Sequence, residues 1–241
     1  MKAVAKTDVG RKRKVNQDYM FACKSDIGIL PNLFMVADGM GGHNAGDVAS
    51  RCCVETMVEQ IEKSKFQTPI SILEEAIKAA NRTISEQALL DSNLRGMGTT
   101  LVAATIIGTE MYVANIGDSR AYLINDKISQ ITEDHSLVEE MVREGEIEKN
   151  SARSHPNKNI ITRALGTSKT VLADFFEITL KENDIALLCS DGLTNMLDDE
   201  VIFDIVSRYV SDIETAAEKL IEKANEFGGL DNIAVVLVKK E

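Results

Sequence analysis

The sequence predicts an α+β fold in which antiparallel strands form the core and helices cover its outer faces. Short runs rich in Val, Ile and Leu come in successive pairs, joined by turns such as 108–110 and 125–127, as in antiparallel meanders. Apolar residues recur at helical spacing in three other segments. Because these segments lie between blocks of strands, we expect the helices on the outside of the sheets.

The helices are predicted from this spacing. Two of them span 45–64 and 70–90, and the region 198–226 holds two more, at 201–209 and 213–226. A shorter, charged helix is expected from Ser136 to Gly145. A polar stretch, NSARSHPNKN, follows it, so this region is predicted to form a surface flap.

The strands are predicted from apolar runs bounded by turn signals. These runs are 33–38, 100–107, 111–118, 121–125, 171–180, 184–191 and 231–240. No domain boundary is evident, so residues 1–241 are expected to form one domain, long enough to bury a large core.

Composition narrows the classes of function. The chain has 38 acidic and 27 basic residues and a formal charge of -11, which disfavours nucleic acids and anionic membranes as partners. Neither a signal peptide nor an apolar run long enough to span a membrane is evident. The four cysteines lack the spacing of a disulfide framework or a zinc site. We therefore expect a cytoplasmic protein with reduced thiols.

Four aspartates stand at the ends of predicted strands. Asp38 follows LFMVA, Asp118 follows YVANIG, Asp191 follows ALLCS, and Asp231 opens DNIAVVLV. Taken singly, each is also compatible with turn chemistry, because Asp-Gly is a common turn dipeptide. If the strand ends converge, the carboxylates repel one another unless cations neutralise them. Hard divalent ions with oxygen ligands do so, and two such ions can share a bridging carboxylate.

Two further motifs could complete such a site. The glycines of DGMGGH (38–43) let the backbone approach a ligand, so a carbonyl such as that of Gly39 could bind metal. The basic run 11–14 is either a solvated face or the source of an arginine that holds a phosphoryl group. His43 is either a loop histidine or a proton donor beside the metals.

Other phosphate-binding mechanisms lack their motifs. The pattern GxGxxG would need glycine at Asn44, and the pattern GxxxxGK[ST] does not occur. No arginine stands six residues after any cysteine, which excludes a C-x5-R phosphatase loop.

Eight motifs occur in the order found in the metal-dependent protein phosphatases, the type 2C serine/threonine phosphatases, and the chain most resembles their compact bacterial members. They cover nearly the whole chain. The motifs are GRKRKVNQD, VADGMGGHNAGDVAS, GMGTTLVAA, VANIGDSRAYL, ITEDHSLV, HPNKNIITRALG, LLCSDGL and GGLDNIAVVLV. The resemblance implies a four-layer sandwich of two antiparallel β-sheets flanked by pairs of α-helices (α-β-β-α).

The resemblance also implies roles for individual residues. Asp38 would bridge two Mn²⁺ or Mg²⁺ ions, with the Gly39 carbonyl on one ion and Asp191 and Asp231 on the other. Bacterial members bind a third ion, which would fall to Asp118 with Asp191. Asp18 would hold metal-bound waters, and Asn232 would help to orient Asp231. Arg13 matches the family's phosphate-binding arginine. Residues 141–165 correspond to a flap that shapes substrate access.

One position departs from the pattern of the animal members. They carry a histidine directly after the Asp-Gly pair and use it as general acid, whereas this chain has Met40. His43, three residues further on, or a metal-bound water would then protonate the leaving oxygen.

The predicted function is that of a protein serine/threonine phosphatase. A hydroxide bridging two metals would attack phosphorus directly, without a phosphoenzyme intermediate. The partners would be phosphorylated proteins and, by resemblance, a serine/threonine kinase and its targets; a monomer is expected. The alternatives are a metal-dependent hydrolase of small phosphate esters and a non-catalytic binding member of the same fold.

Overall fold

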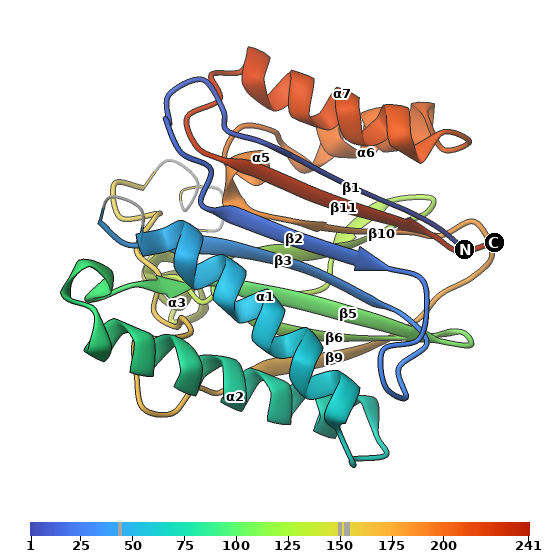
Figure 1. Ribbon diagram of the computed structural model, residues 1–241. Coiled ribbons are helices and arrows are strands. Elements are labelled where there is room, and N and C mark those ends of the chain that lie inside the picture. Colours follow the sequence, from blue (N-terminus) through green and yellow to red (C-terminus); the bar gives the residue numbers. More distant parts are fainter. Residues whose placement is uncertain (43–44, 149–150, 152–154) are drawn as a thin grey trace.

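The structure, a computed structural model, describes residues 1–42, 45–148, 151 and 155–241. Its strands form two sheets, in the orders β1-β11-β10-β7-β8 and β2-β3-β5-β6-β9, with the short strand β4 paired to β3 (Figure 1). All the strand pairs are antiparallel. The strands are β1 (Lys2–Asp8), β2 (Asp18–Cys23), β3 (Leu33–Met40), β4 (Gly98–Thr99), β5 (Leu101–Ile107), β6 (Glu110–Ile116), β7 (Arg120–Ile124), β8 (Ile128–Gln130), β9 (Asp174–Thr179), β10 (Ile185–Cys189) and β11 (Ile233–Lys239).

The two sheets pack face to face, and their central strands are buried on both sides. Along β3, Phe34 and Val36 face the other sheet, whereas Met35 and Ala37 face the helices. Successive side chains of a strand point to opposite faces, so a strand between two apolar layers is apolar at every position. This explains why the central strands read as continuous apolar runs rather than as alternating patterns.

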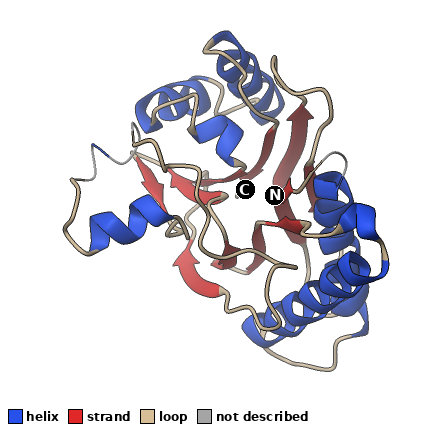
Figure 2. Ribbon diagram, turned by 90° about the vertical axis from the view of Figure 1, so that its left-hand side faces the viewer, coloured by secondary structure: helices blue, strands red, loops and turns tan. Residues whose placement is uncertain are grey.

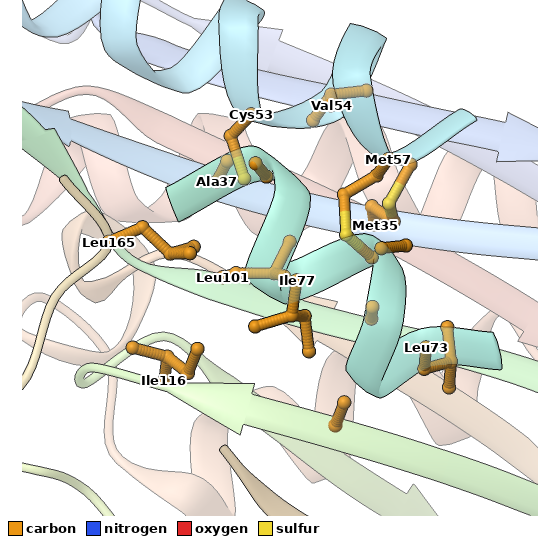
Figure 3. Packing of buried hydrophobic residues seen from close by; sticks show 14 of the residues in the cluster. Met35, Ala37, Cys53, Val54, Met57, Leu73, Ile77, Leu101, Ile116 and Leu165 are labelled. Carbon is orange, nitrogen blue, oxygen red and sulfur yellow. The ribbon is translucent and has the colours of Figure 1, made fainter. Parts of the chain in front are cut away.

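Helices cover the outer face of each sheet (Figures 1 and 2). Below the sheet of β3 and β5, Met57 and Ile77 contribute to a buried layer with Met35 and Leu101 (Figure 3). Above the other sheet, Val206 and Leu220 pack toward Leu187 and Leu237. The helices are α1 (Ala45–Lys63), α2 (Pro69–Leu90), the 3-10 helix η1 (Ser92–Leu94), α3 (Leu137–Arg143), α5 (Asp191–Thr194), α6 (Asp199–Arg208) and α7 (Ile213–Glu226).

The α+β sandwich predicted from the sequence is confirmed, with each long helix and each predicted strand near its expected place. Four strands were not predicted: β1, β2, β8 and the two-residue strand β4. β1 and β2 are edge strands with half-exposed residues, and β8 has only three residues. Among the described helices, none has the length and apolar composition that a bilayer crossing requires.

The arrangement of the strands brings several of their ends to one end of the sandwich, at the left of Figure 1. β3, β6 and β10 finish there, and β2 and β11 begin there. The turn after β6 crosses from one sheet to the other, because β6 and β7 belong to different sheets. Residues on this crossover and at these strand ends therefore share one edge of the molecule.

Candidate metal centre and phosphate site

Five aspartates gather at this edge. Asp18 and Asp38 are direct cross-strand partners in β2 and β3. The others are Asp118, on the crossover between β6 and β7, Asp191, the first residue of α5, and Asp231, two residues before β11. The carboxylate of Asp38 interacts electrostatically with all four others. The structure thus brings together side chains that lie up to 213 residues apart (231 − 18).

The main chain of Asp38 is held on both sides by a pair of threonines. Its N–H donates to Thr100 Oγ1 at 3.0 Å, and its carbonyl accepts from Thr99 Oγ1 and from the Thr100 N–H, each at 2.9 Å. Thr100 Oγ1 also lies 2.7 Å from Ser119 Oγ, next to Asp118. The hydroxyl of Thr100 therefore links the strand that carries Asp38 to the crossover that carries Asp118.

Gly39 allows two segments of main chain to approach each other. Its N–H donates to the Gln17 carbonyl at 3.1 Å. A Cβ at this position would overlap the carbonyl oxygen of Gly46, at the start of α1, and would press on the Gln17 carbonyl. Glycine is thus required by close packing beside Asp38.

Asn232 fixes the loop that precedes β2. Its Nδ2 donates to the carbonyls of Val9 and Val15, at 2.9 and 3.0 Å, and its Oδ1 accepts the Gln17 N–H at 2.8 Å. The N–H of Asn232 donates to Asp231 Oδ1 at 2.9 Å. This buried side chain thereby joins residues 9–17 to the start of β11.

Asp18 and Asp191 are each oriented by one neighbouring side chain. Ser190 Oγ donates to Asp18 Oδ2 at 2.6 Å and accepts the Ala234 N–H at 2.9 Å. Asn195 Nδ2 donates to Asp191 Oδ2 at 2.9 Å. In both cases one carboxylate oxygen is bound and the other is left for a different partner.

Arg13 lies at the rim of the cluster. Its Nη2 donates to Asp231 Oδ2 at 2.7 Å, and about half of its side chain is exposed. The hydrogen bond to Asp231 raises the pKa of Arg13, and the charges of Asp38 and Asp191 add to this effect. A guanidinium that is permanently charged and partly exposed can meet an anionic group arriving from solvent.

The cluster strongly disfavours its own ionisation. Burial raises the pKa of Asp18 to about 8, and repulsion from Asp191 and Asp231 adds to the rise. Burial and repulsion from Asp191 likewise raise the pKa of Asp118 to about 8. The pKa of Asp191 rises to about 6, chiefly through burial and Asp231. For Asp38, burial and four neighbouring carboxylates raise the pKa well above its ordinary range.

The donor set fits divalent cations. One carboxylate oxygen each of Asp18, Asp118 and Asp191 is buried and has no hydrogen-bond partner among the described residues. Buried polar atoms of this kind are costly unless a ligand pairs with them. No three His, Cys, Asp or Glu side chains of the described ranges converge as ligands of a single ion. The arrangement suits hard divalent ions that bind carboxylate oxygens and complete their coordination with waters, as Mg²⁺ does.

The sequence predicted the aspartates, Gly39, Arg13 and Asn232, and the structure brings all of them to this edge. His43 lies outside the described residues, so its predicted role as general acid stays a prediction. The hydroxyl residues and Asn195 were not predicted. Ser190 and Thr100 adjoin predicted motifs, but in a single sequence an isolated hydroxyl residue carries no distinguishing signal.

Comparison with known proteins identifies the family. Residues 9–224 match the family model described as protein phosphatase 2C. The chain is 43% identical over 248 residues to "Serine/threonine phosphatase stp" of Listeria monocytogenes, covering all of this chain and 96% of that protein. The chain therefore belongs to the protein phosphatase 2C family, as its motifs predicted.

Solved structures show the same fold. The S. agalactiae serine/threonine phosphatase superposes with a TM-score of 0.92 at 36% identity, covering 100% of this chain and 99% of that one. The catalytic domain of the serine/threonine protein phosphatase PstP, solved with two manganese ions, gives a TM-score of 0.86 at 33% identity, with coverages of 100% and 98%. The predicted class of enzyme, a metal-dependent protein phosphatase, is confirmed.

Proposed function

We propose that this chain hydrolyses phosphoserine and phosphothreonine in proteins, with residues 1–241 acting as one catalytic domain. The observation that carries this proposal is the cluster of five aspartates with a phosphate-binding candidate, Arg13, at its rim. Family membership supports the same activity, since the relatives that match along the whole chain are serine/threonine phosphatases. The chain is thus a metal-dependent protein serine/threonine phosphatase.

The residues assigned to the metals follow from the donor set. Asp38 would bridge two ions, joined by the Gly39 carbonyl on one side and by Asp191 and Asp231 on the other, and a third ion would bind Asp118 with Asp191. The buried, unpaired oxygens of Asp118 and Asp191 support this assignment. When bound, Mn²⁺ or Mg²⁺ supplies positive charge that stabilises phosphoryl oxygens and yields a water-derived nucleophile near neutral pH.

The chain's own residues bind and orient the substrate around those ions. Arg13 would hold the phosphoryl oxygens through the N–H groups that its bond to Asp231 leaves available. Asp18, fixed by Ser190, would accept hydrogen bonds from ordered waters. Asn232 would hold the loop that carries Arg13 next to Asp231. The proton for the leaving serine or threonine oxygen would come from His43 or from water.

Phosphate release from a phosphothreonine peptide tests the proposal. We expect release with Mn²⁺ and none with EDTA. Asp38→Asn should lower turnover by at least about 100-fold in Mn²⁺, because an amide neither bridges cations nor carries their compensating charge. Circular dichroism should show the variant folded. Near-normal turnover by the variant would contradict the bridging role. A nucleotide hydrolysed faster than the phosphopeptide would favour the small-ester alternative.

The setting of the enzyme is a further part of the proposal. The four cysteines are all unpaired, which fits a reducing compartment and therefore the cytoplasm. We propose a monomer whose substrates are proteins phosphorylated by a serine/threonine kinase, with residues 141–165 shaping access to the site. Size-exclusion chromatography with light scattering tests the monomer.

A further inference from the structure

His135 is a buried histidine that contacts the crossover carrying Asp118. Only 5% of it is exposed. The main-chain N–H of His135 donates to the Gly117 carbonyl at 2.9 Å, and its ring nitrogen Nδ1 accepts the Gly117 N–H at 3.0 Å. Both polar groups of the Gly117 main chain are therefore bound by one residue. Gly117 has a φ of +100° and directly precedes Asp118, so these two bonds hold an unusual main-chain conformation beside a proposed metal ligand.

The other ring nitrogen is held from the opposite side. Because Nδ1 accepts a hydrogen bond, the neutral ring carries its hydrogen on Nε2. Nε2 lies 3.0 Å from Asp174 Oδ2, at the start of β9, and can donate to it. Asp174 also accepts from Arg163 Nη1 at 2.9 Å. A chain of hydrogen bonds thus runs from Arg163 and Asp174 through the imidazole to Gly117.

The neighbouring residue, Asp134, holds the far side of the same crossover. Arg120 donates to Asp134 through Nε, at 2.9 and 3.0 Å, and through Nη2, at 2.7 Å. His135 therefore binds the residue just before Asp118, and Asp134 binds Arg120, two residues after it. Asp118 itself keeps a buried oxygen without a partner among the described residues.

We propose that His135 is a positioning residue that orients Asp118 for its metal ion through the Gly117 main chain, with Asp174 fixing the imidazole. The inference rests on the proposed function, because it takes Asp118 as a ligand of the third ion. It adds a residue that contacts neither metal nor substrate. The position of the carboxylate then depends on which ring nitrogen accepts and which donates.

Two substitutions separate the two nitrogens. In His135→Asn the amide oxygen can take the place of Nδ1 and accept the Gly117 N–H, but the side chain is too short to reach Asp174. In His135→Gln the amide nitrogen can take the place of Nε2 and donate to Asp174, but the Gly117 N–H loses its acceptor. His155→Asn is the matched control, since the described partner of that ring is the nearby Asn157 N–H.

Mn²⁺ binding measured by calorimetry is the primary readout. Asp118→Asn first identifies the binding step that belongs to Asp118. We expect His135→Gln to weaken that step by about 10- to 100-fold, the usual effect of losing a group that orients a ligand. His135→Asn should stay within a few-fold of the wild type, and the other ions should bind normally in both variants. Equal losses in the two variants, or none, would overturn the proposal.

Two further measurements keep the outcome clear. Thermal unfolding in EDTA should be similar for His135→Asn and His135→Gln, so that a difference in Mn²⁺ affinity cannot come from general instability. Should His135→Gln fail to fold, Asp174→Ala at a partly exposed position makes the test. Arg163 Nη1 lies 3.2 Å from Nε2 and can only donate, so without Asp174 the ring hydrogen moves to Nδ1 and the Gly117 N–H loses its acceptor. The same binding step should then weaken, and Asp174→Asn, whose amide oxygen can accept from Nε2, should restore it. A wild type without Mn²⁺-dependent phosphate release would instead refute the proposed function.

Discussion

At the scale of single residues, the carboxylate cluster depends on hydroxyl groups that hold its members in place. Thr100 binds the main chain of Asp38 and contacts Ser119 beside Asp118. Ser190 binds the side chain of Asp18 and the main chain of Ala234. Each hydroxyl is buried and joins two segments that are distant in sequence. The cluster is therefore preorganised by groups that would touch neither metal nor substrate.

Replacing Ser190 with alanine tests this preorganisation. The change leaves the buried Ala234 N–H without its acceptor and frees Asp18 to turn. We expect a loss of about 1–3 kcal/mol in the free energy of unfolding and a roughly 10- to 100-fold lower kcat/KM. Urea unfolding and phosphate release measure the two effects. Ser207→Ala, at an exposed helical position, is the control, and equal behaviour of the two variants would refute the role of Ser190.

Replacing Arg13 with lysine separates charge from geometry. Lysine keeps the positive charge but loses the planar fork that fits two phosphoryl oxygens. We expect KM for a phosphopeptide to rise and kcat/KM to fall by about 10-fold or more, with Mn²⁺ affinity nearly unchanged. Arg11→Lys, in the same exposed basic run, should behave as wild type. A loss of the same size at both positions would indicate general attraction by the run instead.

The charged members of the site could be predicted from the sequence, and the hydroxyl members could not. An aspartate directly beside an apolar strand stands out, because carboxylates are rarely placed near a core without a partner. Ser190 and Thr100 are small and polar, and such residues occur equally in turns and at strand ends. Their roles depend on Asp18 and Asp38, which reach them only through the fold.

At the scale of elements, the loop 9–17 is held by one side chain rather than by secondary structure. Asn232 makes three hydrogen bonds to its main chain. Gly229 adds a contact, since its carbonyl accepts the Arg11 and Lys12 N–H groups at 2.7 and 3.2 Å. The loop that presents Arg13 is thus positioned by the residues just before β11.

Asn232→Ala should loosen this loop. It removes both donors and the acceptor that bind the loop, so we expect about 2–3 kcal/mol less stability and a higher KM for the phosphopeptide. Asn93→Ala, whose exposed side chain bonds only its neighbour Asp91 among the described residues, is the control. Urea unfolding measures the loss of stability, and peptide kinetics measure KM. An unchanged KM in Asn232→Ala would show that the loop holds Arg13 in place without Asn232.

The strands differ in how clearly the sequence predicts them, and burial is the reason. β10 and β11 are apolar at almost every position because one face meets the other sheet and the opposite face meets α6 and α7. β1 and β2 pair on one side only, and many of their side chains are partly exposed. Lys2 and Lys6 interrupt the apolar pattern of β1, and β2 offers only a short apolar run after Asp18. Edge strands tolerate such residues, which removes the signal that revealed the central strands.

At the scale of the whole molecule, two packed sheets concentrate negative charge at one edge. Burial raises the pKa values of Asp18 and Asp118 to about 8 and that of Asp191 to about 6. The folded, metal-free protein therefore keeps protons that the unfolded chain releases near the ordinary pKa of 3.8. Wherever the folded state binds more protons, stability falls as pH rises. The fall spans the range from about pH 4 to about pH 8.

Divalent ions should reverse this trend, because they replace the protons and bind the folded state alone. We expect the Tm in EDTA to fall steadily between about pH 5 and pH 8, and the gain in Tm on adding Mn²⁺ to grow over the same range. Asp38→Asn should flatten both dependences, since it removes the carboxyl that repels all four others. Differential scanning calorimetry measures each curve. A Tm in EDTA that rises with pH would mean that the aspartates are stabilised as anions by the protein itself, and the cluster would then need no metal to balance its charge.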